Sequence, residues 1–500
     1  MLLASFLVGA IILVVEIMGT RVISPYYGAS IYVWSSLIGV TLASLTVGYV
    51  LGGWAADRWP RLPGLALEMI GGALCLLLLP WMRRGVLAAT TPLGLKAGAL
   101  VSAALLFAPP LVLLGMTGPV AIRLVTSEVT LLGRGVGKIY GVSTLGSMLG
   151  AILTGFFLIP NFSVSGVLLA GAGVLLVLGG GGLLVARRTL AGTSALAVGM
   201  LVAAGLERAP APPSNVIYLG NSFHGEIKVV DTKDVRVLLI NGVDNGFVDR
   251  RSMESRAPYI ALFEYLPAAR PAAKRALCIG LGSGSVPRAF HLRHGIASEV
   301  VEIDSVIVHV ARRYFDFPAD IPVIVEDGRT YVEHAPHRYD FVVLDAFASE
   351  MLPGHLFTRE FFARVDAVLE PGGILAINMV GLPDGASAVA WRSVHRTLAE
   401  RFAHLRVFAG EQTDPAARDR YTNIFLVASR EPLPAPAALA NGEALASMAR
   451  LEVDPPAGGP AYVLTDDYNP IDDLQRPFLV ALREDLIRKE QSVLLFDGTR

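Results

Sequence analysis

Charged side chains are scarce in this chain: Asp, Glu, Lys and Arg together make up 17% of its 500 residues, whereas hydrophobic residues make up 53%. An average soluble protein carries roughly 25% charged residues, so this balance excludes a chain that is water-soluble throughout. The formal net charge is −1, and the chain therefore lacks the basic field that nucleic-acid binding requires. We expect part of the chain to lie in a lipid bilayer, and we expect no nucleic-acid partner.

Cysteine is equally rare, since Cys75 and Cys278 are the only two in the chain. Two such distant cysteines provide neither a disulfide framework nor the ligand spacing of a metal site. Cys75 lies in an apolar run and Cys278 in a predicted strand, and we interpret both as core residues. The sequence thus predicts no bound metal.

The hydrophobic residues gather in residues 1–206, in runs such as MLLASFLVGAIILVVEIMG that reach the roughly 20 residues of a bilayer-spanning helix. Further spans follow the first run and no basic segment precedes it, so we interpret it as a transmembrane helix and not as a signal peptide. We expect seven or eight helices, because APP at 108–110 is compatible with a kink in one helix or a turn between two. The expected ranges are about 2–23, 32–56, 65–82, 95–125, 137–160, 163–186 and 190–206.

Glu16 lies deep in the first apolar run, where an ionisable group is costly and is usually paired or functional. Two interpretations stay open: an ion pair of Glu16 with Arg21 or Arg123 that holds helices together, and a polar path for a substrate. The segment GVSTLGSMLGAILTG has small residues at helical spacing, which indicates close helix packing.

A change of composition at 207–214, ERAPAPPS, predicts a linker between two domains. Residues 215–250 contain short extended runs separated by turn residues, which is typical of a small antiparallel sheet. In residues 251–500, five β-rich runs alternate with helical patterns. This alternation predicts an α/β, Rossmann-like domain of the class I methyltransferase type, whose ligands bind at the carboxyl ends of the strands.

A glycine-rich turn follows the first of these strands, in CIGLGSGSVPRAF. Gly280, Gly282 and Gly284 allow a sharp turn and the close approach of a ligand to the helix that follows. One strand later, VVEID brings Glu302 and Asp304 to a strand end, where an acid is the usual partner of ribose hydroxyls. The two motifs together favour an adenosine-type ligand over a purely structural turn.

Two further strand ends carry single aspartates. VEDGRTYV places Asp327 and Gly328 where a carboxylate can accept a hydrogen bond from the exocyclic amine of adenine. FVVLDAFASEMLP then delivers Asp345 to the next strand end, beside the expected place of the non-adenosine part of the ligand. A helix cap or an ion pair would also explain Asp345, so its function stays open at this point.

In this order, the motifs resemble the spermidine synthase (polyamine aminopropyltransferase) family, together with LLINGVDNG before them and HLFTREFFARVDAVLEPGGILAINM after them. The apolar half resembles the N-terminal region of membrane-fused spermidine synthase-like proteins. Its matching segments are GYVLGGWAADR at 48–58, GMTGPVAIRL at 115–124 and IYGVSTLGSMLGAILTGFFLIP at 139–160.

The resemblance implies transfer of an aminopropyl group from decarboxylated S-adenosylmethionine to an amine, with methylthioadenosine as the second product. Because a free amine has a pKa near 10, its attack at neutral pH needs a group that orients it and takes its proton. By resemblance, Asp345 is this catalytic aspartate. Asn245 and Ser283 fall at cofactor-binding positions, and Tyr259 falls at a substrate-binding position.

The chain departs from the family pattern on the side of the amine acceptor. Ala348 replaces a second aspartate, Ser283 replaces an aspartate of the glycine-rich turn, and Asn245 replaces a glutamine. Ile260 and Ala261 stand where the family has histidine and glutamate. Several groups that would hold a cationic diamine are therefore absent together, whereas the adenosine side is retained.

Other acids of the chain offer replacements for the missing ones. We favour Asp466 and Asp467 of LTDDYNPIDDL as substrate-binding residues, with solvated loop acids or a turn formed with Asn469 and Pro470 as the alternative interpretation. The remaining candidates are Asp244, Asp249, Glu411 and Asp414.

The sequence therefore predicts a membrane-bound, aminopropyltransferase-like enzyme that uses decarboxylated S-adenosylmethionine or S-adenosylmethionine as donor and a small amine or polyamine as acceptor. One alternative is the transfer of a methyl or aminocarboxypropyl group to a non-polyamine substrate. Another alternative is a sensor or transporter that binds a nucleoside or polyamine without turnover. Soluble relatives associate, so the resemblance also implies a homo-oligomer.

The expected location is the cell inner membrane, with several passes through the bilayer. Basic residues near 57–61, 134–138 and 187–188 favour the cytoplasmic side for those loops, which with seven helices would leave the second domain outside. An adenosyl sulfonium donor is cytosolic, however, and we expect the second domain in the cytoplasm for this reason.

Overall fold

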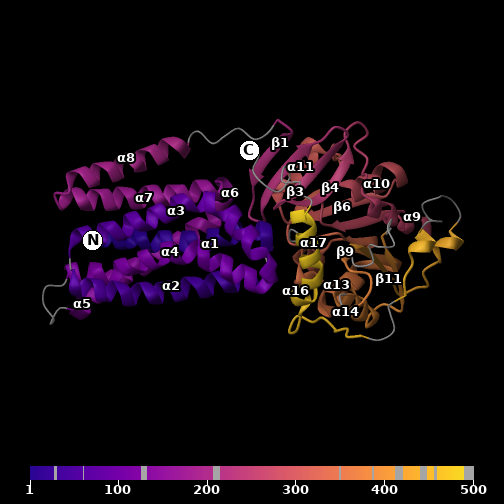
Figure 1. Cartoon of the computed structure of the whole chain (residues 1–500). Helices are drawn as coiled ribbons and strands as arrows, with labels where there is room; N and C mark the ends of the chain where they lie inside the picture. The colour runs from indigo at the N-terminus through magenta and orange to yellow at the C-terminus, as the bar shows by residue number, and fades with distance from the viewer. Residues whose placement is uncertain are drawn as a thin grey trace. The chain divides into compact units, whose positions relative to one another are not determined.

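The computed structural model divides the chain into two compact units, Met1–Ala211 and Pro212–Arg500 (Figure 1). Residues 207–213 of the predicted linker lie outside the described part of the chain. The described residues are 1–27, 31–59, 61–125, 132–206, 214–347, 351–385, 388–410, 421–439, 448–454 and 459–488.

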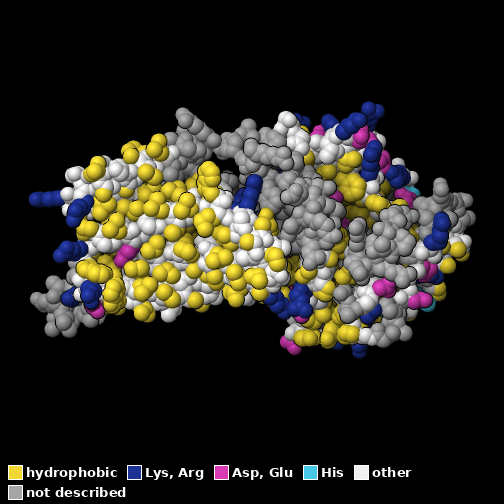
Figure 2. Space-filling model, in the orientation of Figure 1, with side chains coloured by type: hydrophobic (Ala, Val, Ile, Leu, Met, Phe, Trp, Pro, Cys, Tyr) yellow, Lys and Arg dark blue, Asp and Glu magenta, His cyan; other side chains and the backbone are white. Residues whose placement is uncertain are grey.

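The first unit is helical. Its helices are α1 (Leu2–Tyr27), α2 (Ile31–Arg58), α3 (Leu62–Thr90), α4 (Gly94–Val125), α5 (Leu132–Leu153), α6 (Ile159–Asn161), α7 (Val164–Val185) and α8 (Thr189–Leu206). Among the described residues, 5 helical stretches are long and apolar enough to cross a membrane, and the longest of them, Leu62–Val125, contains both α3 and α4. Hydrophobic side chains dominate the face of this unit that Figure 2 shows. The unit is thus compatible with a membrane domain.

The structure settles one open point of the sequence analysis and corrects one boundary. Pro109 and Pro110 lie inside α4, so APP is part of one continuous helix. Helix α3 does not end near residue 82 but continues past Pro80 to Thr90. A buried contact lies at its end, where Thr90 Oγ1 is 2.7 Å from the hydroxyl of Tyr27 in α1 and 2.6 Å from that of Ser102 in α4.

Helices α1 and α5 pack through glycines, as the small residues of α5 predict. A Cβ atom on Gly146 would collide with the carbonyl oxygen of Phe6, and one on Gly150 would lie 2.6 Å from the carbonyl oxygen of Ala10. In addition, Ser147 Oγ donates a 3.0 Å hydrogen bond to the carbonyl of Gly9. Small side chains therefore let the two backbones touch.

The second unit begins with a small antiparallel sheet. Its strands β1 (Val216–Asn221), β2 (Glu226–Asp231), β3 (Val235–Ile240) and β4 (Val243–Asp249) are neighbours in chain order. Asn241 and Gly242 both have positive φ, which is the conformation of a tight hairpin turn between β3 and β4. This turn directs β4 toward the main sheet, where Asn245 and Gly246 approach the glycine-rich turn.

The main sheet has seven strands in the order β10-β11-β9-β8-β5-β6-β7. They are β5 (Arg275–Ile279), β6 (Ala297–Glu302), β7 (Val323–Val325), β8 (Tyr339–Leu344), β9 (Leu369–Gly381), β10 (His404–Ala409) and β11 (Thr422–Ser429). Strands β5 to β9 are parallel, which confirms the predicted Rossmann-like fold. The sequence analysis missed the antiparallel pair β10 and β11, which makes the sheet mixed.

Helices cover both faces of this sheet. They are η4 (Pro258–Glu264), α9 (Tyr265–Ala269), α10 (Ser285–His294), α11 (Ser305–Tyr314), α12 (Gly328–His334), η5 (Gly354–Leu356), α13 (Arg359–Val368), α14 (Val389–Ala399), η8 (Pro436–Ala438), α16 (Ile471–Leu474) and α17 (Arg476–Arg488). One apolar core contains Phe290 of α10 and Val310 of α11, and the other contains Phe361 of α13 and Leu398 of α14. From β5 the chain turns to β6 on one side and later returns to β8 on the other, so a crevice is expected where the carboxyl ends of β5 and β8 meet.

We expect Gly146→Ala to destabilise the helical unit by about 1–3 kcal/mol, because the added methyl group meets the backbone of α1. Gly141→Ala on the same helix is the matched control, since nothing lies within 4 Å of the added Cβ. Alanine is the better helix former there, and this variant should be neutral or slightly more stable. Thermal unfolding of the detergent-solubilised chain measures both, and equal melting temperatures for the two variants would contradict this packing.

Candidate active site

The glycine-rich turn touches the end of β8. Gly280 has a φ of 97°, and a Cβ atom there would collide with the carbonyl oxygen of Asp345. The amide of Asp345 in turn donates a 3.0 Å hydrogen bond to the carbonyl of Ile279. Only glycine fits this contact, because it has no side chain and tolerates positive φ. Two predicted site residues, Gly280 and Asp345, are therefore adjacent.

The small sheet lies against the same turn through β4. A Cβ atom on Gly282 would lie 3.1 Å from the carbonyl oxygen of Asn245, and one on Gly246 would lie 2.8 Å from Ser283 Oγ. Asn245 itself donates its side-chain amide to the carbonyl of Val243 at 3.0 Å. The structure thus brings Asn245 and Ser283 together with the glycines, as the sequence analysis expects.

Glu302 is buried behind the turn and holds it in place. Its two carboxylate oxygens accept hydrogen bonds from the backbone amides of Leu281 and Asp304, both at 2.9 Å. Burial raises the pKa of Glu302 to about 7, although these hydrogen bonds lower it. Asp304 has a different role: its side chain accepts a hydrogen bond from the amide of Val306 and caps α11.

Asp327 combines a helix cap with a contact to histidine. Its Oδ1 accepts from the amides of Arg329 and Thr330 at the start of α12, and its Oδ2 lies 2.8 Å from His355 Nε2. Burial raises the pKa of Asp327, but these hydrogen bonds outweigh burial and hold it below its usual value. The next residue is Gly328, and a Cβ atom there would collide with the side chain of Ile279.

Asp345 is held by a chain of two asparagines. Its Oδ1 accepts a 2.8 Å hydrogen bond from Asn378 Nδ2 on β9, and Asn378 Oδ1 accepts a 3.0 Å hydrogen bond from Asn423 Nδ2 on β11. Burial raises the pKa of Asp345 to about 6, against the effect of the bond to Asn378. Within the described residues, Asp345 makes no ion pair and caps no helix. This geometry favours a functional carboxylate over the structural alternatives.

Tyr259 stands in η4 near this carboxylate. Burial raises its pKa well above the usual value, and the charges of Asp345 and Asp244 raise it further. The phenol is therefore neutral at physiological pH and available as a hydrogen-bond donor. Asp244 of β4 was only one of several candidates in the sequence analysis, and the electrostatic effect on Tyr259 connects it to the site.

Asp466 and Asp467 do not join this group. Asp466 binds Arg329 of α12 through both carboxylate oxygens, at 2.7 and 2.5 Å, and the amide of Asp466 donates to Glu360 at 3.0 Å. Asp466 is therefore one half of an ion pair, which the sequence analysis did not predict, and its charge is already neutralised. Asp467 is exposed. Ala348, Glu411 and Asp414 lie outside the described residues.

The sequence analysis missed His355, Asn378 and Asn423. Asn378 is a polar residue within the apolar run ILAINM, and this was the signal that could have found it. It is only 2% exposed, so a buried amide needs partners, and it finds them on both sides. His355 and Asn423 carry no comparable signal in the sequence.

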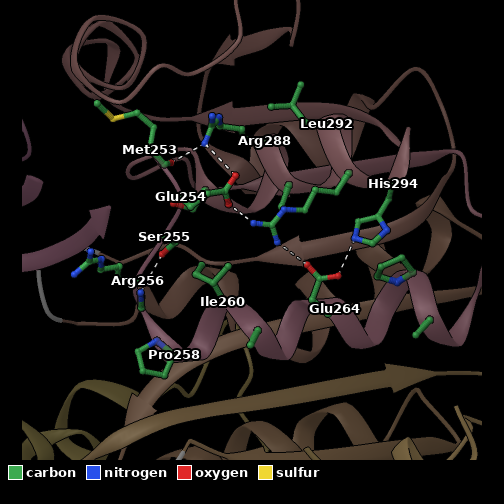
Figure 3. Close-up of a pocket in the computed structure, with 17 residues that line it drawn as sticks. Met253, Glu254, Ser255, Arg256, Pro258, Ile260, Glu264, Arg288, Leu292 and His294 are labelled. Atoms are coloured by element: carbon green, nitrogen blue, oxygen red, sulfur yellow. Dashed lines mark hydrogen bonds and ion pairs between the residues drawn. The ribbon is translucent and has the colours of Figure 1, made fainter. Parts of the chain in front are cut away.

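A cavity of about 720 Å³ lies between η4 and α10 (Figure 3). Its charged lining is paired: His294 Nε2 lies 2.8 Å from Glu264, and Arg293 bridges Glu264 and Glu254. Arg288 donates a 2.6 Å hydrogen bond to the carbonyl of Met253. None of the predicted site residues lines this cavity. We therefore place the candidate active site at the strand ends and not in this cavity.

Part of the second unit is similar to known proteins. Residues 229–380 match the family model of the spermine/spermidine synthase domain, and this range contains Gly280, Glu302, Asp345 and Asn378. A probable polyamine aminopropyl transferase of Bifidobacterium longum (strain NCC 2705) is 30% identical over 214 residues, which are 42% of this chain and 47% of the relative. The polyamine aminopropyltransferase of Vibrio vulnificus (strain CMCP6) is 33% identical over 177 residues, 33% of this chain and 59% of the relative.

A relative with another name matches a similar length. The N-terminal histidine N-methyltransferase of Emericella nidulans is 33% identical over 189 residues, 35% of this chain and 33% of the relative. The chain thus spans from 33% to 59% of the length of these three curated relatives.

Solved structures are similar at lower identity. The crystal structure of a probable spermidine synthase from Corynebacterium glutamicum has 22% identity and a TM-score of 0.38, and covers 48% of this chain and 87% of its own. Spermidine synthase from Thermotoga maritima has 19% identity and a TM-score of 0.38, and covers 47% and 84%. On the match of residues 229–380, and with polyamine aminopropyltransferases among its relatives, the chain contains a spermine/spermidine synthase domain.

Proposed function

We propose that the chain is a membrane-bound aminopropyltransferase that takes its aminopropyl group from decarboxylated S-adenosylmethionine and releases methylthioadenosine. The observation that carries this proposal is Asp345, a desolvated carboxylate beside the glycine-rich turn with one oxygen held by Asn378. It lies in a domain whose curated relatives include polyamine aminopropyltransferases.

The adenosine part of the donor is proposed to lie over the carboxyl ends of β5, β6 and β7. Glu302, which the amides of Leu281 and Asp304 hold in place, would accept hydrogen bonds from the ribose hydroxyls. Asp327 would accept a hydrogen bond from the adenine amine, with His355 fixing the orientation of its carboxylate. The glycines leave room for the ligand above the turn.

The transfer needs no more than a positioned base and an unprotonated amine. The amine nitrogen attacks the carbon next to the sulfonium, a C–N bond forms, and the C–S bond breaks with its electron pair on sulfur. Sulfur becomes a neutral thioether, and the new ammonium loses a proton to Asp345. The raised pKa of about 6 suits Asp345 to this task, because it is closer to neutral pH than that of an ordinary carboxylate.

The helical unit is proposed to hold this enzyme at the cell inner membrane. Its apolar helices support a bilayer location, and the cytosolic origin of an adenosyl sulfonium donor supports a cytoplasmic location for Pro212–Arg500. An amine that reaches the site from the membrane would fit both features. Self-association is a further part of this proposal, which size measurements in detergent can test.

Methyl transfer is the second candidate function. It is favoured by the similarity to a relative named as a histidine N-methyltransferase and by the replacement of several family acids, such as Ser283 in the glycine-rich turn. The nucleoside product separates the two, because methyl transfer from S-adenosylmethionine leaves adenosylhomocysteine and aminopropyl transfer leaves methylthioadenosine.

We expect the purified chain to form methylthioadenosine from decarboxylated S-adenosylmethionine only when an amine is present. Asp345→Asn should lower this rate by about 10²- to 10⁴-fold, the usual contribution of a general base. Mass spectrometry of the nucleoside products with a panel of amines measures both. Adenosylhomocysteine as the product from S-adenosylmethionine would favour methyl transfer, and tight binding without turnover would favour a sensor.

We also expect Asp345→Asn to make the second unit more stable at pH 8. The pKa of Asp345 is higher in the folded protein than in the unfolded chain. The folded state therefore loses stability as the pH rises from about 4 to about 6, and above that range the buried charge of Asp345 destabilises it. Asparagine keeps the acceptor for Asn378 without the charge, so the gain should be on the order of 1–3 kcal/mol at pH 8. The gain should be smaller at pH 5.

Thermal unfolding of the full chain in detergent measures this effect. The unfolding transition of the second unit is the one whose temperature should shift when methylthioadenosine is added. Asp467→Asn is the control, since that side chain is exposed and should change stability little at either pH. A loss of stability in Asp345→Asn at pH 8 would mean that the carboxylate is structural.

A further inference from the structure

A second carboxylate of the site has an oxygen without a partner. Asp244 Oδ1 accepts a 2.9 Å hydrogen bond from the amide of Gly246, whereas Oδ2 makes no hydrogen bond within the described part of the chain. The side chain keeps exposed surface, yet the surrounding protein desolvates it enough to raise its pKa above the usual value. Asp244 is therefore accessible to a ligand, although the protein around it partly removes its hydration.

The neighbouring acids of the small sheet behave differently. Asp231 of β2 pairs with Arg236 at 2.7 Å and with Arg250 at 3.1 Å. Asp249, at the end of β4, pairs with Arg256 and accepts from two backbone amides. Asp244 is also on β4, but no described cation lies within ion-pair distance of it. A desolvated carboxylate is costly when unpaired, so a cation supplied by a ligand would remove this cost.

The position of Asp244 indicates which side of the site it serves. The residues that follow it on β4, Asn245 and Gly246, lie against Gly282 and Ser283 of the glycine-rich turn. The charges of both Asp244 and Asp345 act on the phenol of Tyr259, and Asp345 ends β8. Two carboxylates from different sheets therefore lie near one neutral donor.

We propose that Asp244 binds an alkylammonium group, that of the donor's aminopropyl arm, while Asp345 serves the acceptor amine. This inference rests on the proposed function, in which the donor lies over the turn that β4 touches. Ser283 itself carries no charge. The negative charge near Ser283 would instead come from Asp244 of the small sheet.

The charge of Asp244 would discriminate between two possible donors. The arm of decarboxylated S-adenosylmethionine ends in an ammonium group alone, whereas the arm of S-adenosylmethionine also carries a carboxylate. Asp244 attracts the first group and repels the second, and specificity arises from this difference. Methylthioadenosine lacks the arm, so its binding should not depend on the charge of Asp244.

Asp244→Asn tests this directly, because the amide oxygen of asparagine can still accept from Gly246 and so preserves the turn. Calorimetric titration of the full chain in detergent gives dissociation constants for decarboxylated S-adenosylmethionine, S-adenosylmethionine and methylthioadenosine. We expect the first to weaken by roughly 10- to 100-fold, the effect of losing one hydrogen bond to a charged group, and the last to stay within about twofold. Asp234→Asn, an exposed acid of the same sheet, should change none of them.

A double variant separates charge from structure. Ser283→Asp in the Asp244→Asn background returns a carboxylate to the same region, because Ser283 adjoins Gly246. It should restore at least part of the preference for the decarboxylated donor over methylthioadenosine. Equal weakening of all three ligands in Asp244→Asn, or no weakening, would overturn the inference. A raised KM for the amine with unchanged donor binding would also overturn it, and would assign Asp244 to the acceptor.

The outcome is distinguishable from failure of the proposed function. If the wild type binds the decarboxylated donor through Asp244 but forms no methylthioadenosine with any amine, the binding inference stands and the proposed function fails. If turnover occurs and Asp244→Asn keeps the donor preference, the function stands and the inference fails.

Discussion

The backbone contact between Gly280 and Asp345 is the constraint on which the rest of the site depends. It joins the glycine-rich turn after β5 to the end of β8, the two neighbouring strands where the chain reverses its direction across the sheet. No residue with a Cβ atom fits there. Because of this contact, whatever lies over the turn also lies beside the carboxylate of Asp345. In the proposed function, this contact would place the reactive end of an adenosyl ligand beside the group that takes the proton.

The carboxylates around this contact are desolvated to different degrees, and their partners explain their different properties. Glu302 is fixed by two backbone amides, Asp327 by a helix start and a histidine, and Asp345 by an asparagine. Amide hydrogen bonds orient a carboxylate without neutralising it. Asp466, in contrast, forms an ion pair with Arg329 of α12. In the proposed function, the carboxylates of the first kind accept hydrogen bonds or a proton from the ligands.

In both units, glycines allow two backbone segments to approach closely, but the consequences differ. In the helical unit Gly146 and Gly150 let α5 pack on α1 with the two backbones in contact. In the second unit Gly280 and Gly282 combine close approach with positive φ, and they shape the turn beside Asp345. The number of glycines does not distinguish these two roles. The backbone conformation of each glycine does.

The sequence by itself determined the two-part organisation, the parallel strands β5 to β9, and the strand-end positions of Gly280, Glu302, Asp327 and Asp345, because these follow from local periodicity and turn chemistry. Only the tertiary structure decided which acids are free. The sequence favoured Asp466, but the fold pairs it with Arg329, and it brings Asp244 and Asn378 to the site from strands far apart in the chain. Asn423 and the strand pair β10 and β11 were likewise missed. Pairing and desolvation depend on neighbours that are distant in sequence, and no local pattern records them.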